Sequence, residues 1–307
     1  MNNMLFTNPI AAYCPIHFHA LRQTADAGCP QIELQFPNDP YSATELSELL
    51  QLSKLTPVAF RAPVSLGLGT SPFPLEEWKH WLALIAQLNL ERPRLVCHAA
   101  PVPLGAIFEY MDDHPTDFHS LQEMKSELVK RIAAQLNQLH ELGKAANIEL
   151  FIENAPMGGD AYFEPGHSML YPVLRTPRHL LQLTEQAPVQ ICFDTAHARI
   201  TSNALTYMHR SRSLFAGATE QEILHAPNHW LRFHELCKER IGLVRLGYAL
   251  SWGDTPSTRH IPFPESTYDE LIDFAEQVDP SLPIVLAVGG KEALQQSLAT
   301  LHELKRT

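Results

Sequence analysis

An aspartate and a histidine stand close together at the end of an apolar run, ICFDTAHARI, at residues 191–200. Apolar residues alternate with more polar ones up to Asp194, and His197 follows three positions later. This alternation is typical of a β-strand with two different faces. At the end of such a strand a carboxylate and an imidazole can bind a metal, form an acid–base pair or cap the next helix. This segment alone does not choose among the three.

Other apolar runs also end near a charged or imidazole side chain. They place Arg61, His98, Glu153 and Arg245 at or near the ends of expected strands. Buried charge is costly unless it is paired or bound to a metal. These residues therefore indicate either a functional site or a network of buried salt bridges that only sets the fold.

The elements that would position these residues are eight short strand-like runs separated by helical patterns. The expected strands are PIHFH (15–19), QIELQF (31–36), VAFRA (58–62), RLVCH (94–98), IELFIE (148–153), VQICFD (189–194), LVRLGY (243–248) and PIVLAV (283–288). Eight β units with helical spacers predict a (β/α)8 TIM barrel, with a doubly wound open sheet as the alternative. No linker or change in composition divides the chain, so we expect a single domain over residues 1–307.

Within these strands the apolar residues keep one parity and the polar residues the other. The apolar side should pack against the outer helices, and the polar side should point to the barrel axis. The inward set contains His19, Glu33, Arg61, His98, Glu153, Asp194 and Arg245. Because active sites of TIM barrels lie at the carboxyl ends of the strands, we expect a common cavity there.

Start signals mark several of the helices between the strands. Ser42 and Glu45 form a capping box. Thr176 and Pro177 are suited to be the N-cap and the first residue of another helix. The longest helix is expected over residues 120–147.

Composition and charge exclude several classes of protein. The net charge of −11 argues against nucleic-acid and anionic membrane partners. No segment reaches the roughly 20 apolar residues of a membrane span, and the first residues do not resemble a signal peptide. The five cysteines are scattered without metal-knuckle spacing, so we expect reduced thiols and a cytoplasmic protein.

Several segments together resemble the xylose-isomerase-like TIM barrels. This superfamily includes sugar isomerases and epimerases and the endonuclease-IV-like apurinic-site nucleases. The resemblance covers nearly the whole chain and is carried by FRAPVSLGLG, LVCHAAP, IELFIENAP, ICFDTAHA, RHIPFPEST and LPIVLAVGG. The pair IEN and FDTAH is its most specific part.

The resemblance implies a set of metal ligands, carried over position by position. His98, Glu153, Asp194, His197 and His260 match residues that bind metal in the nuclease branch. It therefore implies one divalent metal ion, zinc or manganese, as the cofactor. No nucleotide cofactor is expected.

Four ligand positions depart from the family pattern. Arg61 and Arg245 stand where the family has histidines, Thr258 replaces an aspartate, and Ala287 replaces the glutamate of the last strand. Arginine cannot ligate a metal, because it stays protonated and offers no lone pair. We expect its guanidinium groups to neutralise a carboxylate cluster or to hold an anionic group of a substrate.

The resemblance favours an isomerase or epimerase that acts on a small sugar or polyol derivative. Glu153 and Asp194 would be the catalytic carboxylates, and Arg61, Arg245, His19 and Trp252 would contact the substrate. A loop tryptophan such as Trp252 can stack on a sugar ring. Two alternatives stay open: a metal-dependent phosphodiesterase of the endonuclease-IV type, favoured by the three histidines, and a non-catalytic barrel that binds a small molecule.

Overall fold

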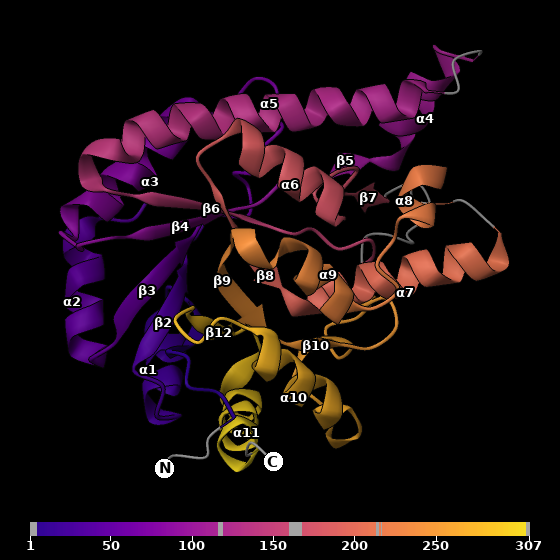
Figure 1. The fold of residues 1–307 in the computed structure, drawn as a ribbon. Coiled ribbons are helices and arrows are strands. Elements are labelled where there is room, and N and C mark those ends of the chain that lie inside the picture. Colours follow the sequence, from indigo (N-terminus) through magenta and orange to yellow (C-terminus); the bar gives the residue numbers. More distant parts are fainter. Residues whose placement is uncertain (1–4, 116–118, 160–167, 213–214, 216, 305–307) are drawn as a thin grey trace.

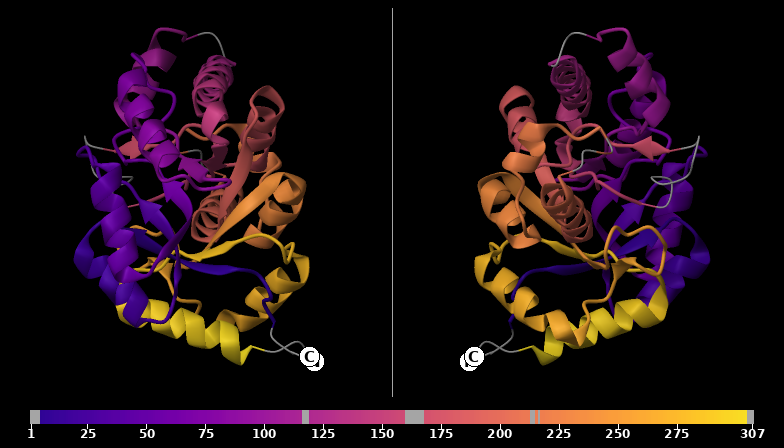
Figure 2. Two further views of the ribbon diagram at one scale, coloured as in Figure 1. Left: turned by 90° about the vertical axis from the view of Figure 1, so that its left-hand side faces the viewer. Right: turned by 90° about the vertical axis from the view of Figure 1, so that its right-hand side faces the viewer.

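The chain folds into a closed barrel of eight parallel strands surrounded by helices (Figures 1 and 2). The computed structural model describes residues 5–115, 119–159, 168–212, 215 and 217–304. The barrel strands are β1 (Ile10–Pro15), β2 (Gln31–Gln35), β3 (Thr56–Arg61), β4 (Arg94–Cys97), β6 (Glu149–Glu153), β8 (Gln190–Asp194), β9 (Ile241–Leu246) and β12 (Ile284–Leu286). Pairing of β1 with β12 closes the barrel, so the predicted (β/α)8 fold is confirmed and the open sheet is wrong.

The helices follow the strands in sequence and cover the outside of the barrel (Figure 2). They are α1 (Phe18–Asp26), α2 (Ala43–Ser53), α3 (Leu75–Gln87), α4 (Leu104–Asp112), α5 (Ser120–Gly143), α6 (Pro177–Gln186), α7 (Thr195–Ser211), α8 (Glu220–Leu224), α9 (Trp230–Cys237), α10 (Tyr268–Gln277) and α11 (Gly290–Glu303). Two small antiparallel sheets lie outside the barrel: β5 (Val102–Pro103) with β7 (Met169–Leu170), and β10 (Tyr248–Ala249) with β11 (Arg259–Ile261). Among the described residues, no helix is long and apolar enough to cross a membrane.

The prediction for the first strand is wrong. The strand runs over Ile10–Pro15, and residues 15–19 lead into helix α1. His17 caps this helix, because its Nδ1 accepts the N–H of Ala20 at 3.1 Å. Phe18, expected to be an apolar strand residue, is 59% exposed. The true strand faces the barrel axis with the small residue Ala11, which gives a weak hydrophobic signal.

The helix signals were mostly correct. The Ser42–Glu45 capping box is present, and the long helix α5 ends at Gly143 before a short 3-10 turn. Thr176 is the N-cap residue of α6 and Pro177 is its first residue, but the Thr176 side chain makes no capping hydrogen bond.

The barrel interior has an apolar layer and a charged layer. The apolar layer consists of Ala11, Ala59, Val96, Phe151, Cys192, Leu243 and Val285. Nearer the carboxyl ends of the strands, which we call the barrel mouth, the inward side chains are Glu33, Arg61, Glu153, Asp194 and Arg245. The predicted inward parity of these five residues is therefore confirmed. The five cysteines are buried free thiols.

Candidate functional site

Arg61 and Glu153 form a two-pronged ion pair at the barrel mouth. They lie at the last positions of β3 and β6, so their side chains meet across the intervening β4. Arg61 Nη1 and Nη2 each lie 2.5 Å from one oxygen of the Glu153 carboxylate. The planar guanidinium matches the carboxylate geometry, and such bidentate pairs are stronger than single hydrogen bonds.

Arg245 lies deeper and contacts three carboxylates. Its Nη1 donates to Glu33, and its Nε lies 3.2 Å from Glu153 Oε1 and 3.2 Å from Asp194 Oδ2. The side chain is only 6% exposed. Three buried carboxylates and two guanidinium groups thus form one network, as the sequence predicted for Arg61, Glu153, Asp194 and Arg245. We call these four residues and Glu33 the charged cluster.

The cluster answers the question raised by the DTAH segment, because Asp194 both caps a helix and forms ion pairs. Asp194 Oδ1 accepts the backbone N–H of His197 at 2.9 Å and caps α7. Its Oδ2 accepts hydrogen bonds from Arg245 Nε at 3.2 Å and from His260 Nε2 at 2.9 Å. One carboxylate therefore fixes a helix, a buried arginine and a histidine together.

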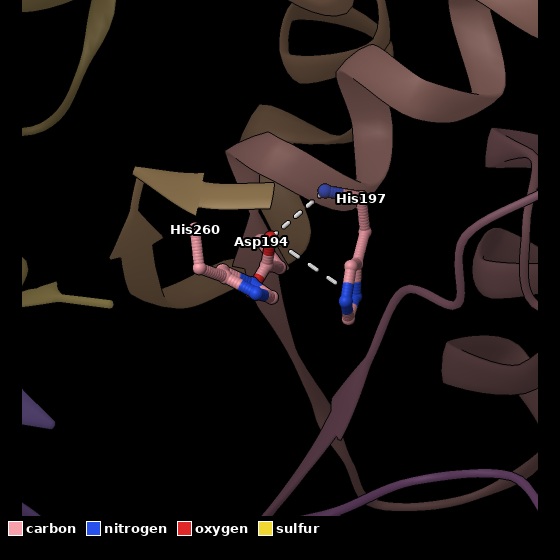
Figure 3. A group of neighbouring side chains, drawn as sticks. All are labelled: Asp194, His197 and His260. Atoms are coloured by element: carbon pink, nitrogen blue, oxygen red, sulfur yellow. Dashed lines mark hydrogen bonds and ion pairs between the residues drawn. The ribbon is translucent and has the colours of Figure 1, made fainter. Parts of the chain in front are cut away.

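Two histidines flank Asp194 (Figure 3). The His197 Nδ1 lies 2.9 Å from the carbonyl oxygen of Asn154, so Nδ1 carries the proton and Nε2 keeps its lone pair. The ring centroids of His197 and His260 lie 5.0 Å apart, and the angle between the two ring planes is 68°. Each of Asp194, His197 and His260 offers one ligand atom, and these atoms lie within 4.8 Å of one another.

The cluster strongly changes the acidity of its carboxyl groups. Burial raises the pKa of Glu153, but Arg61 and Arg245 outweigh burial and lower it to about 2. Burial also opposes ionisation of Asp194, yet His197, His260 and Arg245 hold its pKa well below the ordinary value. For Glu33 burial is the stronger effect and raises the pKa, with Arg245 and Arg61 offsetting part of it.

The mouth opens into a cavity of about 470 Å³. Its walls include Arg61, His98, Glu153, Tyr171, His197 and Arg259. Burial, followed by the nearby Arg61, lowers the pKa of His98 to about 4, and burial also lowers the pKa of His197. The cavity therefore presents two neutral imidazoles beside a guanidinium–carboxylate pair at pH 7.

Two residues predicted to contact a substrate lie elsewhere. His19 lies in the first turn of α1 and is exposed, because the first strand ends earlier than expected. Trp252 stacks on Phe215 with ring centres 5.1 Å apart and contacts Tyr207 edge-on at 5.5 Å. The substrate contacts of His19 and Trp252 stay predictions.

Sequence reasoning missed two members of the site. Glu33 was recognised as inward-facing but was not assigned a role, although it is the ion-pair partner of Arg245. Asn154 exchanges two hydrogen bonds with the Asp194 backbone, at 3.0 and 2.6 Å, and its carbonyl orients His197. In the sequence, the position of Asn154 directly after Glu153 was the signal that could have placed it in the site.

A divalent ion of the isomerase type does not fit between Glu153 and Asp194. The guanidinium of Arg245 occupies the space between the two carboxylates, and Ala287 offers no ligand atom at the end of β12. The Asp194–His197–His260 group is the remaining candidate for an ion among the described residues. Carboxylate and imidazole ligands suit zinc or manganese.

The buried neutral histidines predict acid-sensitive stability. Burial lowers the pKa of His98, His179 and His234 to about 4 each. The unfolded chain then takes up protons near pH 6.5 that the folded chain refuses until about pH 4. The stabilisation is complete above pH 6.5, and the free energy of unfolding should fall as the pH is lowered from 6.5 to 4. Urea titrations at several pH values measure this slope, which should become smaller in His234→Gln; an unchanged slope in that variant would contradict the assignment.

Comparisons with known proteins identify similar folds at low sequence identity. A D-tagatose 3-epimerase-like protein superposes with a TM-score of 0.61 and 14% identity over 96% of each chain. A 3-keto-D-glucoside 4-epimerase from E. coli superposes with a TM-score of 0.56 and 12% identity, and the match covers 97% of this chain and 100% of the epimerase. An AP endonuclease of family 2 from Brucella melitensis superposes with a TM-score of 0.56 and 15% identity, and the match covers 97% of this chain and 100% of the endonuclease. No family model and no curated protein sequence matches the chain.

Proposed function

Because the chain has the fold of the xylose-isomerase-like TIM barrels, we propose that it is an isomerase or epimerase of a small sugar or polyol derivative. The substrate would bind in the 470 Å³ cavity at the barrel mouth. The observation that carries this proposal is the placement of neutral His98 and His197 beside the Arg61–Glu153 pair on the walls of one cavity.

His197 is the proposed proton acceptor. Its Nδ1 donates to the Asn154 carbonyl at 2.9 Å, which leaves the Nε2 lone pair available and fixes the ring orientation. A base that is neutral at the working pH can remove a proton next to a carbonyl group. The Arg61 guanidinium, whose side chain is 14% exposed at the cavity, is placed to stabilise negative charge on the substrate oxygen.

The assignment of Glu153 and Asp194 as catalytic carboxylates stays a prediction. Both oxygens of Glu153 are occupied by Arg61, and its pKa of about 2 makes it a weak base. Asp194 is held by Arg245, His260 and the α7 amide. In our proposal the two carboxylates position the arginines and histidines, and Glu153 transfers a proton only if Arg61 releases it.

The experiment is hydrogen exchange on a panel of ketoses and aldoses in D2O, followed by NMR at the carbon next to the carbonyl. The protein should catalyse deuterium incorporation into at least one sugar. His197→Gln should reduce the rate by about 100-fold or more. His302→Gln, which changes an exposed histidine on α11, is the matched control and should keep the full rate. Exchange that is unaffected in His197→Gln would contradict the proposed base.

The metal-dependent phosphodiesterase is the second candidate, favoured by the Asp194–His197–His260 group. A zinc or manganese ion held by these residues would activate a water for attack on a phosphodiester. Stoichiometric metal after dialysis, together with hydrolysis of a phosphodiester and no deuterium exchange, would select this function. Sugar binding without either activity would select the non-catalytic barrel.

A further inference from the structure

The cavity at the barrel mouth has a charged and polar floor. The floor is formed where three barrel strands end, by Arg61 of β3, His98 directly after β4 and Glu153 of β6. His197, in the first turn of α7, completes it. These side chains offer hydrogen-bonding groups, which suit the hydroxyl groups of a sugar.

The rim of the same cavity is apolar. Each of the three segments that leave the floor presents apolar residues within the next three positions. They are Val64 after Arg61, Ala99 and Pro101 after His98, and Ala155 and Pro156 after Glu153. Met169 of the small β5–β7 sheet also lines the cavity. We call these six apolar residues the apolar rim.

The apolar rim offers little for a hydroxyl group to bind. Its side chains carry no strong hydrogen-bonding group, and Pro101 and Pro156 also lack a backbone N–H. Among the described residues, the polar side chains beside the rim are those of Tyr171 and Arg259. Both types of side chain can lie flat against an aryl ring. A sugar ring therefore gains more from the floor, and an apolar group gains more from the rim.

A purely structural role explains only part of the apolar rim. Ala99 and Ala155 are 2% and 6% exposed, as expected of core residues. Val64 in contrast is 71% exposed, and Pro101 and Met169 are half-buried. Single exposed apolar residues are common, but a group of them around a cavity is typical of a ligand-binding groove.

We propose that the substrate is a sugar or polyol derivative that carries an apolar substituent of about the size of a phenyl ring. This inference rests on the proposed function, because it places the sugar ring on the floor beside His197 and Arg61. The substituent would lie against the apolar rim. A cavity of about 470 Å³ is in the size range of pockets for drug-sized ligands, so it has room for both parts.

The test compares the methyl and phenyl glycosides of glucose, galactose and xylose by titration calorimetry at pH 7. These glycosides have no free carbonyl group, so they are not turned over and report binding alone. Wild-type protein should bind the phenyl glycoside of at least one sugar about tenfold or more tightly than its methyl glycoside, because the complex buries the apolar ring.

Val64→Asn is the deciding variant, because a side chain that is 71% exposed can be replaced without disturbing the fold. It should reduce the preference for the phenyl glycoside about threefold and leave the affinity for the methyl glycoside unchanged. The double variant Val64→Asn, Met169→Gln should bind the two glycosides almost equally. Leu52→Asn is the matched control, because Leu52 lies on α2 outside the cavity and is 75% exposed. This control should keep the full preference.

Equal binding of methyl and phenyl glycosides by the wild type overturns the proposal. So does the absence of saturable binding of any phenyl glycoside, or a preference that is unchanged in the double variant. Failure of the proposed isomerase or epimerase function gives a different result, which is no deuterium exchange on the sugar panel while the phenyl preference and its loss in the double variant persist.

Discussion

Replacing Arg245 with alanine should lower the free energy of unfolding by about 3–5 kcal/mol, because it leaves buried carboxylates without their cation. Arg245 is 6% exposed and is paired with Glu33, Glu153 and Asp194. Glu153 keeps Arg61, but Glu33 loses its ion-pair partner in a fully buried position. The pKa of Glu33, already raised by burial, should then rise further. Urea unfolding at pH 7 measures the loss.

Arg92→Ala is the matched control for this measurement. Arg92 also pairs with a glutamate, Glu149, but its side chain is 71% exposed. Exposed ion pairs contribute about 0–1 kcal/mol, so this variant should remain close to the wild type. If Arg245→Ala is as stable as Arg92→Ala but binds anionic ligands more weakly, Arg245 holds a substrate and does not neutralise the cluster.

The double variant Arg245→His, Ala287→Glu should gain a divalent ion between Glu153 and Asp194. The family resemblance places a histidine and a glutamate at these two positions, and both substitutions add a ligand where the present residues offer none. Removing the guanidinium also removes the cation that fills the space between the carboxylates. We expect manganese affinity to rise at least about 100-fold over the wild type, since even outer-sphere partners contribute 10–100-fold.

Elemental analysis and calorimetry with manganese measure this gain. Arg245→His alone is the control, and it should bind more weakly because the last-strand carboxylate is still missing. Equal manganese binding by the double variant and the wild type would show that the exclusion of metal from this position has another cause than Arg245 and Ala287.

The sequence predicted the fold well because its signals are periodic. Seven of the eight expected runs contain most of a barrel strand, and polar residues at one parity correctly indicated the inward face of β2, β3, β6, β8 and β9. The first strand was missed because its inward residues, Ala11 and Tyr13, and its outward residues, Ala12 and Cys14, show no apolar–polar alternation. The neighbouring PIHFH run does show the alternation expected of a strand. His17 in that run instead caps α1, which is a local preference that alternation does not reveal.

The sequence predicted which residues form the site better than it predicted which of them are in contact. The approach of Arg61 to Glu153 and of Arg245 to Asp194 followed from strand ends meeting at one mouth. The role of Glu33 did not follow, because its partner lies 212 residues away in the sequence.

The long sequence separation within the charged cluster has a consequence for how the chain folds. Glu33 and Arg245 lie 212 residues apart, and Arg61 and Glu153 lie 92 apart. Burying Glu33 or Asp194 before β9 has arrived would leave a desolvated carboxylate unpaired, which costs several kcal/mol. The nascent barrel must therefore keep its mouth hydrated until most of the chain has been synthesised. Closure of this layer belongs to the late steps of folding, and a fragment that ends before β9 lacks the arginine that forms the ion pair with Glu33.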